Sequence, residues 1–433
     1  MNFNPIRNKP NLAPYSQGDV LVLFGELFNR GYANGLVDEA IKRGMTIIQT
    51  TVGRRDKDGN LRNLTAEEIP QGPFINVALE AGFDMEKADN GFSPVDQLKD
   101  IKLSDWENAT LDFTAIEQSR QKGVARFRSQ VADYLKQLEP HLPAGKKVLF
   151  AHLMAGGVPR AKIVMPLMNR AFKGSGERYL ASDKFWNSPI GKLCAISFNE
   201  VTANTYRHLI DLSSDLRQKI TASGGHVSYL AYGYHGTDIF FNGEYRWQTY
   251  TPYLQGWAKM ELEKISAEFH GKGVASCVYN CPEILTNSSS IFQGVEVSLY
   301  PLMVALSREA NSSSSAATQK ILADCKALLK DEVSLEQIEK IAAAFFMDSE
   351  IKKHCQFDLW PQHSSQLQLE KLLAISEELY KLHKDEKLLL TSVLSEVVFK
   401  SCGYVMLNDS YSPQQPVAWI GHDIVAKCVD VTW

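Results

Sequence analysis

The sequence predicts an α/β protein with a doubly wound, mostly parallel sheet, and two observations support this fold class. Residues 19–52 contain an apolar run, a glycine turn, a helical pattern and a second apolar run, which together make the β-turn-α-β opening of such a sheet. Runs of strand length and helical patterns then alternate up to residue 300, as expected when helices connect parallel strands.

Glycine and proline residues divide this region into its expected elements. Gly25 follows the first strand, Gly44 ends the first helix, and Pro143 stands after a long helix. In order, the expected strands comprise residues 19–24, 45–52, 74–79, 147–153, 226–232 and 273–279. The expected helices comprise residues 33–43, 114–140, 195–223 and 249–270.

A run of serines at residues 312–315 predicts a flexible connection after this region. We therefore expect an α/β domain at residues 1–310 and a mainly helical extension at residues 311–433 that packs on it. The extension contains helical patterns and then an apolar, strand-like tail at residues 417–433. Its helical patterns comprise residues 316–330, 334–346 and 365–400.

Composition excludes several classes of protein. The 433 residues are 44% apolar and carry a net charge of −4, which gives no reason to expect nucleic-acid binding. The amino-terminal residues show no secretory signal, and no run of about 18 apolar residues predicts a membrane span. Seven scattered cysteines favour reduced thiols in the cytoplasm, and Cys277-x-x-x-Cys281 lacks the second ligand pair of a zinc site. We therefore expect a cytoplasmic protein without a metal centre.

The turn after the first strand has the glycines that a phosphate site requires. Gly25, Gly31 and Gly35 stand at the junction of a strand and a helix, where close backbone approach and free N–H groups bind phosphates. Their spacing differs from G-x-G-x-x-G, so the motif alone is weak. The alternative is that these glycines only shape a turn and a helix contact.

The end of the second strand suggests which dinucleotide binds. No acidic residue precedes Asp56 there, whereas Arg54 and Arg55 suit a ribose 2′-phosphate. We therefore favour NADPH, with NADH as the alternative cofactor. The other interpretation is that both arginines lie in a solvated loop.

A tyrosine–lysine cluster between the fifth and sixth expected strands supplies candidate chemistry. Tyr250 and Tyr253 precede Lys259, which stands near the start of a helix. A tyrosine hydroxyl can donate to an oxygen that gains charge during hydride transfer, and a nearby ammonium stabilises that charge. A packed or surface-exposed pair is the alternative, but open α/β sheets bind ligands at this edge.

Four segments in the right order resemble the enoyl-acyl-carrier-protein reductase branch of the short-chain dehydrogenase/reductase superfamily, which has a Rossmann-type sheet. They are Gly25-x5-Gly31-x3-Gly35, Ser228-Tyr229-Leu230, Gly256-Trp257-Ala258-Lys259 and residues 282–286. The resemblance covers residues 19–295 and assigns residues 282–286 to the nicotinamide carboxamide. The extension after residue 310 has no counterpart in it.

The spacing before Lys259 departs from the common pattern of the superfamily. Gln255 stands four positions before the lysine and Pro252 seven positions before it, where related enzymes have tyrosine. Tyr250 gives a Y-x8-K spacing, similar to the larger, monomer-type bacterial enoyl reductases. On this resemblance we prefer Tyr250 over Tyr253 as the proton donor, with Tyr229 as a second hydroxyl in the pocket.

The resemblance implies an NAD(P)H-dependent oxidoreductase that reduces the 2,3 double bond of an enoyl thioester in fatty-acid synthesis. The acyl group would be carried by acyl carrier protein or coenzyme A, and the oligomeric state stays open. Ketone or 3-oxoacyl reduction, or nucleotide binding without catalysis, are the alternatives. We expect the aromatic residues 234–249 to line the acyl pocket or to pack in the core. The expected cofactor site comprises Gly25, Gly31, Tyr32, Gly35, Arg54, Arg55, Asp84, Ala155, Gly156, Lys259, Pro282 and Thr286.

Overall fold

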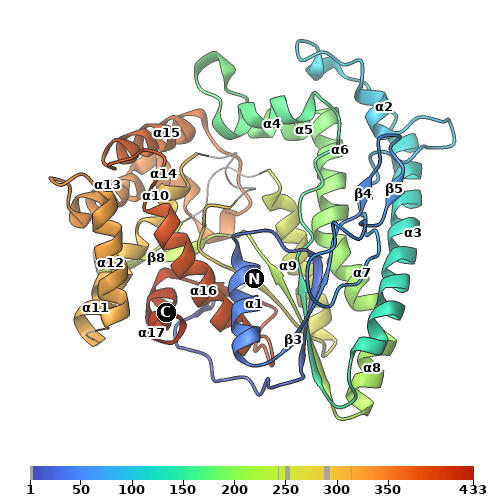
Figure 1. Cartoon of the computed structure of the whole chain (residues 1–433). Coiled ribbons are helices and arrows are strands. Elements are labelled where there is room, and N and C mark those ends of the chain that lie inside the picture. Colours follow the sequence, from blue (N-terminus) through green and yellow to red (C-terminus); the bar gives the residue numbers. More distant parts are fainter. Residues whose placement is uncertain (1–2, 242, 249–253, 287–292, 314) are drawn as a thin grey trace.

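A parallel sheet forms the centre of the protein (Figure 1). The computed structural model describes residues 3–241, 243–248, 254–286, 293–313 and 315–433. Within these residues seven parallel strands have the order β1-β11-β10-β7-β6-β2-β3. Their bounds are β1 Pro5–Ile6, β2 Val20–Glu26, β3 Thr46–Thr50, β6 Lys147–His152, β7 His226–Tyr232, β10 Ala275–Asn280 and β11 Val417–Ile420. The predicted Rossmann-type fold class is confirmed.

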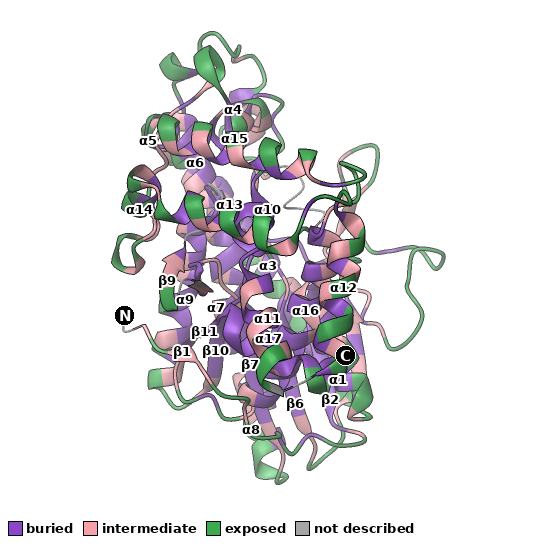
Figure 2. Ribbon diagram, turned by 90° about the vertical axis from the view of Figure 1, so that its left-hand side faces the viewer, coloured by how far each residue is buried: buried purple, intermediate pink, exposed green. Residues whose placement is uncertain are grey.

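Helices cover both faces of the sheet because the strands carry apolar side chains on each side. Along β2, Val20, Val22 and Phe24 pack on one face, and Leu21 and Leu23 pack on the other. The first face is covered by α3 (Phe113–Leu138), α7 (Thr205–Leu212), α8 (Ser214–Ala222) and α9 (Gly256–Gly271). The second is covered by α1 (Tyr32–Lys42), α11 (Leu302–Ser313), α12 (Ala316–Leu328), α16 (Thr391–Asp409) and α17 (His422–Thr432). The inner strands β2, β6, β7, β10 and β11 are almost wholly buried, whereas the edge strands β1 and β3 are partly exposed (Figure 2).

The remaining elements surround this core. The shorter or outer helices are α2 (Pro94–Leu98), α4 (Val164–Lys173), α5 (Ser182–Asn187), α6 (Pro189–Phe198), α10 (Val295–Leu299), α13 (Leu335–Met347), α14 (Ser349–His354) and α15 (Gln366–Lys381). Two hairpins pair β4 (Arg54–Arg55) with β5 (Leu61–Arg62), and β8 (Thr237–Phe241) with β9 (Glu244–Gln248). In Figure 1, α4 and α5 stand above the carboxyl ends of the sheet strands.

Four expected elements were wrong in form. The tail expected to be strand-like at residues 417–433 is helical after residue 421, and the helix expected at residues 365–400 is divided into α15 and α16. Residues 74–79 make only isolated bridges to the β3 segment, because the N–H groups of Val77 and Leu79 bond locally to the carbonyls two residues earlier. The long helix expected at residues 195–223 is divided into α6, a π-helical turn at Asn199–Asn204, α7 and α8. In residues 74–79, local backbone hydrogen bonds therefore replace the strand pairing that the apolar pattern predicted.

The C-terminal region contributes a strand to the central sheet, which therefore extends past the boundary expected at residue 310. β11 lies between β10 and β1, and Val278 faces Val417 in the register. The serine run does not act as a linker in its described part, since Ser315 caps α12 by accepting from the Thr318 N–H at 3.1 Å. Residues far apart in the chain thus share one sheet. No helix in the described residues is long and apolar enough to cross a membrane.

The contact between α1 and α16 is made at backbone distance. A Cβ atom on Gly35 would overlap the carbonyl oxygen of Phe399, and one on Gly403 would overlap the backbone of Gly35. Two glycines facing each other let the helices approach more closely than side chains would allow. This contact holds α16 against α1, the helix that follows the glycine turn.

We predict that Gly35→Ala destabilises the fold strongly, because the added methyl meets backbone that cannot move aside. Overpacking costs about 1–3 kcal/mol in ordinary cores, and we expect at least about 2 kcal/mol here. Denaturant unfolding measures the change. Gly271→Ala, at the end of α9 where a Cβ meets nothing within 4 Å, is the matched control and should be neutral or slightly stabilising. Equal stability of the two variants would contradict the close contact.

Candidate active site

A cavity of about 170 Å³ opens where β2, β6 and β7 end and α1 begins. This is the carboxyl edge of the sheet, at which open parallel α/β folds bind ligands. The cavity is lined by Glu26, Phe28, Arg30, Gly31, Tyr32, Ala33, Asn34, His152, Leu153, Met154, Ala155, Tyr232, Lys259 and Thr286. Five of the predicted site residues are therefore brought together: Gly31, Tyr32, Ala155, Lys259 and Thr286.

The glycine turn after β2 forms one side of the cavity. Gly25 has φ +120°, and a Cβ there would lie 3.0 Å from the backbone of Leu153 and Met154. Gly31 is the N-cap of α1, and a Cβ there would meet nothing closer than Asn34 Oδ1 at 3.9 Å. Gly25 thus lets β2 pass close to the chain beyond β6, while Gly31 leaves open space at the start of a helix.

Gly35 has a different role from the one predicted. It lies in α1 beyond the cavity, and its missing side chain is required by the contact with α16. The alternative interpretation, in which a glycine of this motif shapes a helix contact, is therefore the correct one for Gly35. Steric contact rather than phosphate binding explains the residue.

Lys259 lies in the first turn of α9 with only 8% of its surface exposed. Its Nζ atom donates a hydrogen bond to the carbonyl oxygen of Tyr232 at 2.6 Å. Burial disfavours the charged form and lowers the pKa of Lys259 to about 8. The cavity therefore contains an ammonium group that loses its proton more readily than a surface lysine.

Two stacked tyrosines form one wall of the cavity. The rings of Tyr32 and Tyr232 have centroids 5.8 Å apart and an interplanar angle of 22°. The Tyr32 hydroxyl donates to the carbonyl oxygen of Pro282 at 2.6 Å, so it links α1 to the segment after β10. Pro282, a predicted site residue, is thus bonded to a residue of this wall. Gly156, another predicted residue, has both its N–H and its carbonyl group hydrogen-bonded to the Thr202 hydroxyl.

His152 ends β6 inside the cavity and is electrically neutral there. Its Nε2 atom lies 2.8 Å from the Thr205 hydroxyl. Burial, followed by the charge of Lys259, lowers the pKa of His152 to about 3. The neutral imidazole of His152 therefore adds no positive charge beside Lys259.

Two predicted residues, Tyr229 and Asp84, are buried away from the cavity lining. Tyr229 is fully buried between Ser213 and Arg217, which bond its hydroxyl at 2.7 and 3.0 Å, so it does not enter the cavity. The tyrosine of β7 that lines the cavity is Tyr232, at the end of the strand. Asp84 is also buried, and its Oδ2 atom accepts from the Arg160 N–H at 2.8 Å.

The two arginines after β3 are already paired with carboxylates. Arg54 makes bonds of 2.9 and 2.7 Å to the two oxygens of Glu26. Arg55 binds Glu80 through its Nε atom at 3.0 Å and through a second, shorter contact. A ribose 2′-phosphate would have to compete with these carboxylates.

The proposed proton donors, Tyr250 and Tyr253, lie outside the described residues. The described aromatic residues of the same insertion pack away from the cavity: Trp247 contacts Phe3 and Phe357, and Phe240 lies under Arg308. Core packing, one of the two interpretations of this insertion, accounts for Trp247, whereas Phe240 is half-buried and Tyr245 is exposed.

Sequence reasoning missed several cavity residues. Three of them are the last residues of strands, which is a signal that could have found them in a parallel sheet: Glu26, His152 and Tyr232. The others come from the glycine turn and the chain after β6, namely Phe28, Arg30, Ala33, Asn34, Leu153 and Met154.

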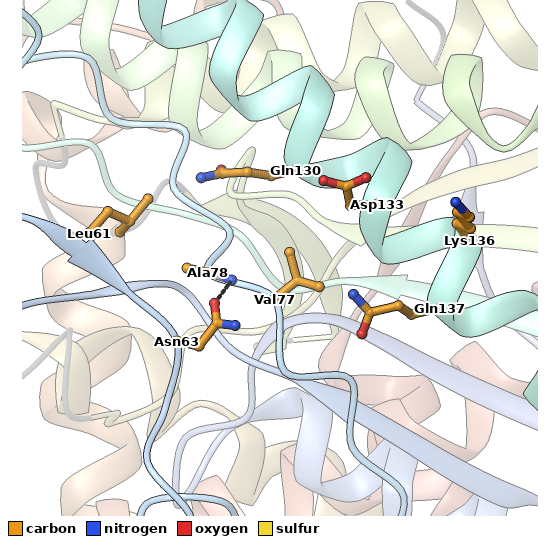
Figure 3. Close-up of a pocket in the computed structure, with 8 residues that line it drawn as sticks. All are labelled: Leu61, Asn63, Val77, Ala78, Gln130, Asp133, Lys136 and Gln137. Atoms are coloured by element: carbon orange, nitrogen blue, oxygen red, sulfur yellow. Dashed lines mark hydrogen bonds between the residues drawn. The ribbon is translucent and has the colours of Figure 1, made fainter.

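A larger hollow of about 630 Å³ lies apart from this site (Figure 3). It is formed between β5, residues 77–78 and the outer side of α3. Asn63 spans its edge by accepting from the Ala78 N–H at 2.9 Å. Its lining includes neither the glycine turn nor Lys259, so the smaller cavity is the candidate active site.

The cavity fits part of a dinucleotide. The free space at Gly31, the start of α1 and the Asn34 Oδ1 atom, which is buried without a hydrogen-bond partner, suit a polar ligand at the helix terminus. Lys259 adds a positive charge beside it. A parallel sheet with a glycine turn and a buried lysine at its carboxyl edge is the arrangement expected of a dinucleotide-binding α/β protein.

Comparisons with known proteins identify the family. The model of the family "Enoyl-acyl carrier protein reductase FabMG" matches residues 2–429, so the chain belongs to that family. It is accordingly an NAD(P)H-dependent enoyl reductase of fatty-acid synthesis. No curated protein matches the chain.

Two solved structures of this family are similar over the whole chain. The apo structure of FabMG, a novel type of enoyl-acyl carrier protein reductase, is 43% identical, with 99% of this chain and 98% of that chain covered and a TM-score of 0.95. An NADH-bound structure of FabMG is 37% identical, with both chains fully covered and a TM-score of 0.80. A nicotinamide cofactor is therefore supported.

We predict that Gly31→Leu weakens dinucleotide binding at least tenfold, because its side chain would project into the cavity. Gly31→Ala is the control, since a Cβ there has room. The Gly31 backbone is extended, so neither substitution strains it. Calorimetry with NADH measures both affinities, and circular dichroism checks the fold. Unchanged affinity in a folded Gly31→Leu protein would remove this turn from the cofactor site.

Proposed function

We propose that the protein reduces the 2,3 double bond of an enoyl thioester held on acyl carrier protein, with NADH as the preferred reductant. The observation that carries this proposal is the buried Lys259 in the same cavity as the glycine turn. Bound NADH supplies a hydride to the β-carbon of the acyl group. The residues of the chain hold the reactants and stabilise the charge that develops.

Tyr250 is the proposed donor to the thioester oxygen. As the β-carbon is reduced, negative charge collects on this oxygen in an enolate, and a phenol hydroxyl aimed at it stabilises the charge at that moment. The same hydroxyl can pass its proton to the product. This role rests on the Y-x8-K resemblance, with Tyr253 as the competing candidate.

Lys259 is proposed to bind the hydroxyls of the nicotinamide ribose and to lower the energy of the enolate. Its ammonium has three donors, of which one is used by the Tyr232 carbonyl. The two others remain for a ligand in the cavity. Because the group is buried, its charge is screened less than that of a surface lysine.

The preference for NADH follows from the ion pairs of Arg54 and Arg55. Arg54 pairs with Glu26, and Arg55 shares Glu80 with Arg126 and Arg160, so both guanidiniums are already bound by carboxylates. A 2′-phosphate brings additional negative charge near Glu26 and Glu80 and would have to displace them from their partners. NADH carries a hydroxyl at this position and avoids that cost, in accord with the NADH-bound relative.

We predict that Tyr250→Phe lowers kcat for crotonyl-acyl carrier protein by roughly a hundredfold or more, because an oxyanion contact is lost. Tyr253→Phe is the matched control and should change kcat much less. Steady-state NADH oxidation measures both, with acetoacetyl thioester and NADPH compared in parallel. Full activity of Tyr250→Phe with a large loss in Tyr253→Phe would reassign the donor. A wild type that binds NADH but oxidises it with no enoyl thioester would reject the proposal.

We predict that NADH affinity falls as pH rises through about 8, since the lowered pKa makes Lys259 lose its proton there. Below pH 7 the ammonium is present and affinity should be constant. A charge-assisted hydrogen bond contributes about 1.5–3 kcal/mol, so a loss of roughly tenfold or more is expected by pH 9.5. Lys259→Met should bind weakly at every pH. Calorimetry across pH 6.5–9.5 measures this.

Lys264→Met is the control for the pH experiment because Lys264 lies on the same helix, exposed and paired with Glu261. It should retain the wild-type affinity and the wild-type pH profile. A wild-type affinity that stays constant up to pH 9.5 would show that the Lys259 charge does not contribute to cofactor binding.

A further inference from the structure

Positive charge is concentrated in one segment of the chain. Residues 158–192, which include α4, α5 and the start of α6, contain seven Lys or Arg residues and two Asp or Glu residues. The whole chain has a net charge of −4. The remainder of the protein is therefore distinctly acidic, and the net charge of this segment has the opposite sign.

This segment packs directly on the helix that carries Lys259. Trp186 of α5 stacks on Trp257 of α9 with ring centroids 5.8 Å apart. Ala258, the neighbour of Lys259, belongs to the same apolar cluster as Phe185 and Phe198. The basic segment is thus placed beside the cavity, above the carboxyl edge of the sheet (Figure 1).

A tight turn after α4 gathers several of its cations. A Cβ on Gly174 would overlap the carbonyl oxygens of both Arg170 and Arg178, which shows how closely the chain folds back. The Leu180 N–H also bonds the Arg170 carbonyl at 3.3 Å. Lys173 stands next to Gly174. Arg170, Lys173 and Arg178 are therefore held in one turn.

These three cations have no ion pair within the described residues, and Lys173 and Arg178 are exposed. Other cations of the segment are neutralised, since Lys184 pairs with Glu107 at 2.7 Å and Arg160 with Glu80 at 2.6 Å. Glu177 stands beside Arg178 in the same turn, so three cations and one carboxylate leave a net positive charge there. Such a surface attracts an acidic partner. We call Arg170, Lys173 and Arg178 the basic turn.

We propose that the basic turn docks an acidic carrier protein that delivers the enoyl thioester to the cavity. This inference rests on the proposed function and adds the surface on which the substrate carrier binds. A folded carrier cannot enter a cavity of about 170 Å³, so only its tethered acyl group does. The carrier must then bind outside, next to Lys259, where the basic segment lies.

The test compares a substrate that carries the acidic protein with one that does not. Lys173→Glu combined with Arg178→Glu reverses two exposed charges, and kcat/KM is measured with crotonyl-acyl carrier protein and with neutral crotonyl-pantetheine. The matched control, Lys136→Glu with Lys330→Glu, makes the same charge change at exposed positions on α3 and after α12. Binding of the crotonyl-carrier is also measured directly by calorimetry.

We expect the basic-turn variant to lose at least tenfold in kcat/KM and in affinity for the carrier, and to stay within twofold for crotonyl-pantetheine. Added salt should weaken the carrier reaction of the wild type more than that of the variant. The control variant should resemble the wild type with both substrates.

Three results would overturn the proposal. They are equal losses with both substrates, unchanged carrier binding in the basic-turn variant, or an equal loss in the Lys136→Glu, Lys330→Glu control, which would assign the effect to overall charge. Failure of the wild type to reduce either thioester would instead reject the proposed function. The calorimetric affinity for the carrier would still decide whether the basic turn is a docking surface.

Discussion

The structure depends on one steric constraint, the contact of α1 with α16 at Gly35 and Gly403. α1 starts at Gly31, whose open side forms the cavity, so the position of this helix fixes where a phosphate can meet its N–H groups. α16 lies more than 350 residues later in the chain and is pressed against α1 without side chains between them. The cofactor site is therefore supported by the C-terminal region, although that region contributes no residue to the cavity lining.

Much of the fold could be predicted from the sequence because long apolar runs and glycine turns are local signals. Lys259 and Gly31 were found for the same reason, as each stands at the start of a helix beside a strand end. β11 could not be found as a sheet member, since its neighbours β1 and β10 are distant in sequence. The partners of a strand are a tertiary property that an apolar run does not show.

The errors at the site have physical causes as well. Tyr229 matched a three-residue motif, but the alternation of side chains along β7 puts its hydroxyl into the core with Ser213 and Arg217. Arg54 suited a phosphate in the sequence, yet Glu26 at the end of β2 already neutralises it. Charge alone does not specify a ligand when the partners of that charge come from other elements.

The sheet order has a consequence for how the chain is made. β11 is synthesised more than 130 residues after β10, yet it is the strand that separates β10 from β1. On the ribosome, the amino-terminal strand therefore has no sheet partner until nearly the whole chain has emerged, and one edge of β10 stays uncovered for the same time. Unpaired strand edges favour association between chains. The sheet is thus completed late in translation, and the edge of β10 is open to association with other chains in the interval.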